Sequence, residues 1–167
     1  MITALAYTLI PVLAALLGAA AAIFFRPGPV LLSAIQHFAA GVVFAAAAGE
    51  ILPDVVHGGS PWATVIGGSA GVAIMLLVRD LEERVRGPVG LLTAVGVDVL
   101  IDGLVLGIGF AAGARAGLLL TIALTLEVLF LGLTVATELG QTARSRVRII
   151  GTVGALVILL PVGALLA

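Results

Sequence analysis

Three carboxylic acids stand inside apolar stretches of this chain, and their types and spacing suit the binding of a cation. Asp98 and Asp102 are four residues apart, so one face of a helix presents both of them. Glu127 stands in the next apolar stretch along the chain. Carboxylate oxygens are the ligands that hard divalent metal ions prefer. The three acids therefore predict a cation site, provided that the elements carrying them meet.

The elements that must position these acids are membrane-spanning helices. Of the 167 residues, 62% are hydrophobic and 10% are charged, and the mean hydropathy is +1.32. A soluble domain carries about 25% charged residues. The net charge of −1 gives no argument for a nucleic-acid partner, and the lack of cysteine excludes disulfides and thiolate metal sites. The composition predicts an integral membrane protein whose main partner is lipid.

Six apolar stretches are long enough to cross a bilayer as helices, which takes about 20 residues each. The predicted spans are residues 2–25, 31–52, 61–78, 91–110, 115–136 and 148–167. All the arginines except Arg115 fall in the first, third and fifth connections, which the positive-inside rule places in the cytoplasm. We therefore predict an all-α, polytopic transmembrane helix bundle that forms a single domain over residues 1–167. We expect both termini to lie outside the cell and the bundle to lie in the plasma (inner) membrane of a bacterium or archaeon.

Helix geometry places the three acids at similar depth. At 1.5 Å per residue, Asp98 lies about 10 Å, Asp102 about 16 Å and Glu127 about 15 Å into the membrane. An ionised acid at the bilayer centre costs roughly 2.5–3.5 kcal/mol, and the interior of the predicted spans holds no lysine or arginine. A proton, a metal ion, a cationic ligand or water must therefore neutralise these acids. The alternative interpretation is that each acid only hydrogen-bonds a neighbouring helix.

Further titratable residues form a second tier of candidates for the ion path. They are His37, Glu50, Asp54 and Glu138. Glu50 and Asp54 end the second predicted span on its outer side, where their charges attract cations. His37 lies in the cytoplasmic half of that span, and Glu138 extends a stripe from Glu127 toward the cytoplasm.

The fourth and fifth predicted spans repeat a phrase. The run D-V-L-I-D-G-L at residues 98–104 corresponds to E-V-L-F-L-G-L at residues 127–133. Because the two spans cross in opposite directions, they are expected to be inverted copies that meet at mid-membrane, where transporters place their sites. Small-residue patterns also predict close contacts between helices of the bundle. These patterns are Gly67-x-x-x-Gly71, Gly103-x-x-x-Gly107 and Gly109-x-x-x-Gly113.

These stretches resemble the motifs of the Zrt/Irt-like (ZIP) divalent metal transporters. The run H-F-A-A-G-V-V-F-A-A-A-A-G-E-I-L-P-D at residues 37–54 is similar to the second span of that family. The fourth span is similar to the family motif H-N-x-P-E-G-L-x-x-G, with Asp98 at the histidine position and Asp102 at the glutamate position. Glu127 takes the first position of the fifth-span motif, and Gly132 takes its glycine position. The resemblance implies transport of a divalent metal, an external N-terminus and a cytoplasmic connection between spans three and four.

The chain also departs from the family pattern. Ile101 and Phe130 stand at the positions of the motif prolines, Val99 stands at that of the asparagine, and the family has eight spans against six here. One all-carboxylate cluster is left where the family has mixed ligands. Such a cluster favours Mn²⁺, Fe²⁺ or Mg²⁺ as the transported ion, and Zn²⁺ is also compatible. The smaller bundle keeps a homodimer open as the assembled form.

We therefore expect a divalent-cation transporter and no enzymatic activity. Two alternatives stay open, namely a ZIP-like membrane protein that does not transport and a metal-dependent membrane enzyme. The membrane CDP-alcohol phosphotransferases use D-x-x-D-G followed by Ala-Arg, whereas the spacing here is D-x-x-x-D-G without a following arginine. Intramembrane aspartyl proteases place their two aspartates on different helices, whereas Asp98 and Asp102 share one.

Overall fold

Helices account for nearly all of the computed structural model of the chain, which describes residues 2–25, 27–84, 88–142 and 145–167. These residues contain no strand. The helices are α1 (Ile2–Phe24), α2 (Pro29–Ala46), η1 (Ala47–Ile51), α3 (Leu52–Gly58), α4 (Pro61–Arg84), α5 (Pro88–Ala112), α6 (Ala114–Thr142), α7 (Arg146–Val157) and α8 (Leu159–Leu166). The element η1 is a single π-helical turn.

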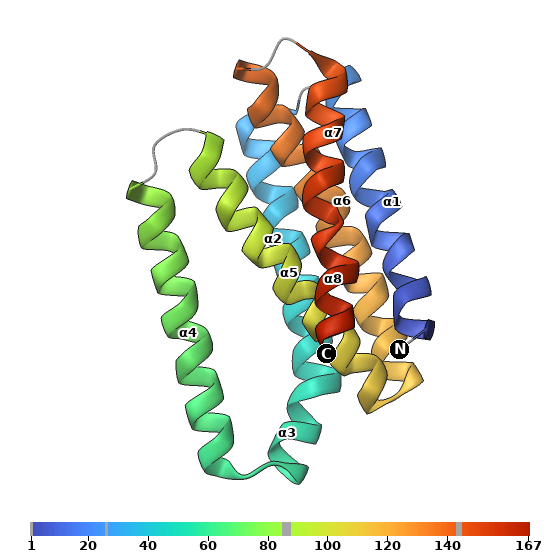
Figure 1. Cartoon of the computed structure of the whole chain (residues 1–167), viewed down its shortest axis with the longest axis vertical. Coiled ribbons are helices and arrows are strands. Elements are labelled where there is room, and N and C mark those ends of the chain that lie inside the picture. The colour runs from blue at the N-terminus through green and yellow to red at the C-terminus, as the bar shows by residue number, and fades with distance from the viewer. Residues whose placement is uncertain (1, 26, 85–87, 143–144) are drawn as a thin grey trace.

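Six helical segments are long and apolar enough to cross a membrane, which confirms the predicted number of spans. Four of them are the single helices α1, α4, α5 and α6, one is the rod formed by α2, η1 and α3, and one is α7 with α8. The two chain ends lie at the same end of the bundle, as an even number of crossings requires (Figure 1). The chain is therefore a multi-pass membrane protein.

The second span continues further than the sequence predicted. Its helical rod runs from Pro29 to Gly58, whereas a turn was expected from Pro53 onward. Proline breaks an α-helix because it lacks an N–H and its ring meets the carbonyl one turn earlier. Here the π turn η1 ends at Ile51, two residues before Pro53, and the N–H of Leu52 bonds to the carbonyl of Ala47, five residues back. This wider turn makes room for the proline, so the rod is not interrupted.

The core lies between α1, α5, α6 and the α7–α8 span. The most extensive contacts join α6 to α1 and α5 to α8, and the two pairs meet where α5 packs on α6. Large side chains that are almost fully buried fill this core, among them Val99, Leu106, Leu124, Val128 and Leu160. The arrangement matters for the site, because α5 and α6 carry the three acids.

Helix α4 stands apart from this core (Figure 1). Its residues 61–77 are all exposed, and it contacts α5 and α3. The prediction that Gly67 and Gly71 mark a close helix contact was wrong, since a Cβ at either position would meet no described atom within 4 Å. In the pattern Gly109-x-x-x-Gly113, the first glycine lies at a close contact and the second does not. A Cβ at Gly109 would overlap Leu120, whereas a Cβ at Gly113 would lie in open space.

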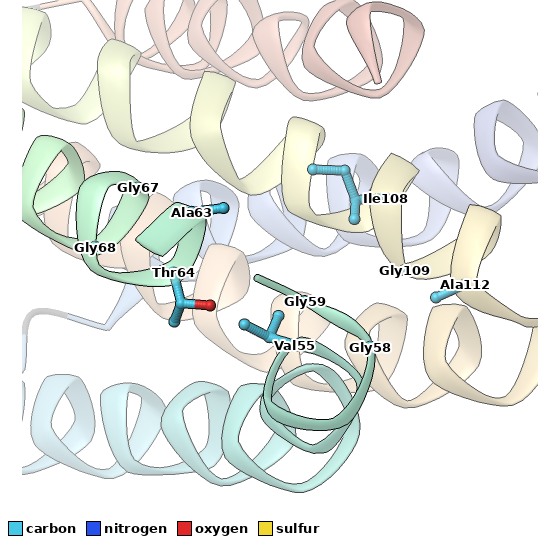
Figure 2. A pocket seen from close by; sticks show the side chains of 10 residues that line it. All are labelled: Val55, Gly58, Gly59, Ala63, Thr64, Gly67, Gly68, Ile108, Gly109 and Ala112. Carbon is cyan, nitrogen blue, oxygen red and sulfur yellow. The ribbon is translucent and has the colours of Figure 1, made fainter. Parts of the chain in front are cut away.

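The separation of α4 leaves a cavity of ≈ 740 Å³ between α3, α4 and α5. Small and aliphatic side chains line it, and Thr64 supplies the one side-chain oxygen of its lining (Figure 2). Among residues whose side chains the structure describes, none of the titratable ones singled out from the sequence lines this cavity. Its described lining therefore offers no charged ligand for a cation.

Candidate metal centre

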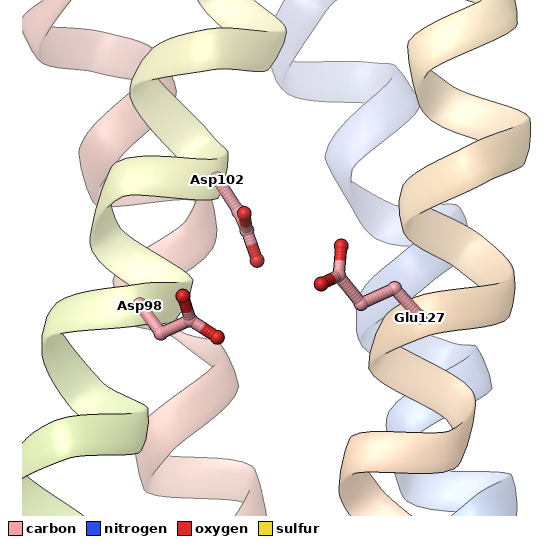
Figure 3. A group of neighbouring side chains, drawn as sticks. All are labelled: Asp98, Asp102 and Glu127. Carbon is pink, nitrogen blue, oxygen red and sulfur yellow. The ribbon is translucent and has the colours of Figure 1, made fainter. Parts of the chain in front are cut away.

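The structure brings together the three acids that the sequence singled out. Asp98 and Asp102 project from successive turns of α5, and Glu127 projects toward them from α6 (Figure 3). Each residue offers one carboxylate oxygen, and these three oxygens all lie within 4.8 Å of one another. All three side chains are half-buried. The inward-facing acids of the two helices therefore form one cluster inside the membrane-spanning part of the protein.

Two oxygens of this cluster are buried without a partner. Oδ2 of Asp102 and Oε2 of Glu127 are shielded from solvent and make no hydrogen bond to any described group. A buried acceptor that lacks a partner costs about 1–3 kcal/mol, and more if it is charged. The like charges of neighbouring carboxylates add repulsion. A cation between the three acids would remove both costs.

The space between the acids suits one divalent cation. Three atoms within 4.8 Å of one another share a point that is no more than about 2.8 Å from each of them, whereas metal–oxygen bonds are about 2.0–2.1 Å for Mg²⁺ and 2.3–2.6 Å for Ca²⁺. A closure of less than about 1 Å, within the range of side-chain rotation, would therefore complete the bonds. Three protein ligands would leave positions for water on such an ion.

Glycines set the positions of the two acid-bearing helices. Gly103 and Gly132 each follow the first acid of the repeated phrase by five residues, which is about 140° around the helix. A Cβ at Gly103 would overlap the carbonyl oxygen of Leu160 on α8, and one at Gly132 would overlap that of Ala15 on α1. In both copies of the phrase the acid thus faces inward, while the glycine lets an outer helix approach the backbone closely.

The outer helices α1 and α8 also have glycines at these contacts, which the sequence analysis did not single out. A Cβ at Gly18 on α1 would overlap the carbonyl oxygen of Leu129, and one at Gly163 on α8 would overlap that of Leu100. A signal for them exists in the sequence. Residues 9–12 read L-I-P-V and residues 159–162 read L-L-P-V, so each of these glycines follows a similar proline run. Reciprocal glycine contacts therefore join α6 to α1 and α5 to α8.

His37 and Glu138 lie outside the cluster. His37 is exposed, and its Nδ1–H donates to the carbonyl oxygen of Ser33 on its own helix at 2.7 Å. Glu138 is exposed and accepts a hydrogen bond of 3.3 Å from Nε2 of Gln141. The stripe on α6 that was expected to link Glu127 to Glu138 therefore runs from the core to the surface.

We expect His37→Ala to change the affinity for a divalent cation by less than about twofold. The reason is that the imidazole is exposed and hydrogen-bonds to its own helix, and that it is not among the residues whose ligand atoms converge. Titration of the purified variant with Mn²⁺, followed calorimetrically, measures the effect. A loss of affinity as large as that caused by removing one of the three acids would place His37 among the ligands.

Glu50 stands in the π turn η1 and lies near Arg115, at the start of α6. Its side chain is 22% exposed, and its Oε1 lies 4.0 Å from Nη2 of Arg115, whose side chain is 87% exposed. A pair this exposed and this long contributes little to stability. The side chain of Asp54 lies outside the described residues. Glu50 is thus separate from the cluster and belongs to the opposite surface from most of the arginines.

A second cavity, of ≈ 290 Å³, opens beside Asp98 and is lined by residues of α2, α4, α5 and α6. Its polar wall includes Gln36 and Arg79, which the sequence analysis did not place near the acids, together with Thr134. Nε2 of Gln36 donates to Oγ1 of Thr134 at 3.3 Å and so joins α2 to α6. One sequence signal for Gln36 exists, since it is an isolated amide in an apolar run.

Comparison with family models, with curated proteins and with solved structures gives no match for this chain. The chemistry of the site therefore rests on its own residues, their distances and their burial. Those point to a small group of carboxylate oxygens that α5 and α6 bring within 4.8 Å of one another, with each of the two helices packed through glycines on an outer helix.

Proposed function

We propose that this protein transports divalent metal cations and that Asp98, Asp102 and Glu127 are the ligands of the transported ion. One observation carries the proposal: three carboxylates converge inside the membrane-spanning helices, and two of their oxygens are buried without a partner. Ionisable residues within membrane spans are costly and typically mark an ion or proton path. The resemblance of the two motif-bearing spans to ZIP transporters supports the same function.

The ligand set favours a hard cation. Three carboxylates and water suit Mn²⁺, Fe²⁺ or Mg²⁺, and Zn²⁺ also accepts such oxygens. Ligands bind metal in their deprotonated form, so uptake of the ion is expected to displace protons from the carboxyl groups. The finer assignments belong to the same proposal, namely a ZIP-like arrangement with both termini outside, a homodimer, and the plasma (inner) membrane of a bacterium or archaeon.

The packing of the helices suggests how the ion crosses. The glycine contacts make α1 with α6 one tight unit and α5 with α8 another. The ligands are divided between these units, since Glu127 belongs to the first and both aspartates belong to the second. A movement of one unit against the other therefore changes the coordination of the ion and the side to which the site opens. Alternating access needs such a coupling.

The test is ion flux into proteoliposomes that contain the purified protein, measured for Zn²⁺, Mn²⁺, Fe²⁺, Mg²⁺ and Ca²⁺. We expect flux of one or more of these ions, and none in the double variant Asp98→Asn/Asp102→Asn. Absence of flux for every ion from well-folded protein would contradict a transporter. Binding measured on the same preparation then identifies a protein that holds cations without moving them.

A further inference from the structure

The cavity beside Asp98 reaches the cluster from one end of the bundle. Along α5 its lining extends from Leu91, near the start of the helix, to Asp98, about two turns deeper. Its other walls include Gln36, in the first half of α2, and Arg79, in the last turns of α4. All of these lie toward the end of the bundle that carries most of the arginines.

The opposite half of the α5–α6 interface is packed. Leu106, Leu120 and Leu124 are at most 1% exposed there. Phe110 closes the same end, where its ring contacts Gly117 and stacks obliquely on Tyr7 at 5.1 Å between centroids. The larger, apolar cavity lies on this side of the membrane but has none of the three acids in its lining. The cluster therefore communicates with one end of the bundle through a cavity whose mostly apolar lining includes the polar side chains of Gln36, Arg79 and Thr134, and it is separated from the other end by packed side chains.

We infer that the ≈ 290 Å³ cavity is the route by which water and the cation reach the carboxylate cluster. This inference rests on the proposed function. Asp98 belongs both to the cluster and to the lining of the cavity, so the cavity ends at one of the proposed ligands. Gln36 and Thr134 line the same space and supply polar groups for water along the route.

The lack of cysteine makes the route directly testable, because a single introduced thiol has no competitor in the chain. Ala94 lines the cavity and is half-buried, whereas Ala123 is 2% exposed in the packed half of α6. In the full-length protein in sealed vesicles, we expect a membrane-impermeant cationic thiol reagent to modify Ala94→Cys from the arginine-rich face alone. Mn²⁺ should slow the reaction, and Ala123→Cys should stay unmodified. Modification from the opposite face, or no faster than that of Ala123→Cys, would overturn the route.

The results of these experiments can reject the route without rejecting the proposed function, and the reverse. Thiol reaction rates need no bound metal, so labelling of Ala94→Cys from the arginine-rich face, combined with an Asp102→Asn variant that binds Mn²⁺ normally, would remove the metal site and keep the route. Normal cation flux combined with an unreactive Ala94→Cys would remove the route and keep the transporter.

Discussion

Asp102→Asn is expected to weaken the binding of Mn²⁺ at least about 100-fold, which corresponds to about 2.7 kcal/mol of binding free energy. The substitution keeps the shape of the side chain but removes the charge of one of the three proposed ligands. Asp102 has Asp98 one turn away on its own helix and Glu127 opposite it on α6. Calorimetric titration of the purified variant with Mn²⁺ measures the change.

The same variant should be more stable than the wild type when no metal is present. In the wild type a buried oxygen of Asp102 has no partner and faces other carboxylates. An amide in its place removes one like charge and can donate a hydrogen bond to Glu127. We expect the midpoint of thermal unfolding in detergent to rise in metal-free buffer. Glu138→Gln, which neutralises an exposed acid on α6, should change neither affinity nor midpoint, and an Asp102→Asn protein that binds Mn²⁺ like the wild type would rule out the site.

Gly132→Ala is expected to destabilise the bundle by about 2–3 kcal/mol, as overpacking of a tight contact does. The added methyl group would overlap the backbone carbonyl of Ala15, which cannot rotate out of the way as a flexible side chain can. Separation of α1 from α6 would also displace Glu127, so the affinity for the cation should fall as well. Thermal unfolding followed by circular dichroism, together with titration of the variant, checks both effects.

Gly71→Ala supplies the matched control for this experiment. It adds the same methyl group inside a membrane-spanning helix, but to a position with no described atom within 4 Å. Its stability should equal or slightly exceed that of the wild type, because alanine is the better helix former. If the two variants had the same stability, the close approach of α6 to α1 would not contribute to the fold.

Hydropathy and spacing were sufficient to predict the spans and the cluster. Crossing a bilayer requires a long apolar segment, which is a local property of the chain, so the six helices follow from composition alone. The cluster follows from two further local rules. A spacing of four residues puts Asp98 and Asp102 on one face, and counting the helix rise puts Glu127 at their depth.

Other features depend on which helix faces pair, and local patterns do not specify that. The patterns Gly103-x-x-x-Gly107 and Gly67-x-x-x-Gly71 have the same spacing but different surroundings. A Cβ at either glycine of the first pattern would overlap α8 or the residue that follows it, Ala167. A Cβ at either glycine of the second pattern would meet no described atom within 4 Å. Arg79 looked like an ordinary charge at a membrane surface. Its place in the wall beside Asp98 arises because α4 leaves the core and touches α5 only along part of its length.

The position of the cluster along its helices has an electrical consequence. Asp102 is the fifteenth of 25 residues in α5 and Glu127 the fourteenth of 29 in α6, so a bound ion lies close to half depth. One elementary charge that crosses the whole membrane gains or loses about 2.3 kcal/mol per 100 mV. A doubly charged ion that crosses half of the membrane therefore also gains or loses about 2.3 kcal/mol per 100 mV. This energy corresponds to a roughly 50-fold change in the occupancy of the site. If the protein is the transporter proposed above, with its N-terminus outside, a negative cell interior would favour loading from outside and release to the cytoplasm by similar amounts, so one voltage would power both halves of the proposed transport cycle.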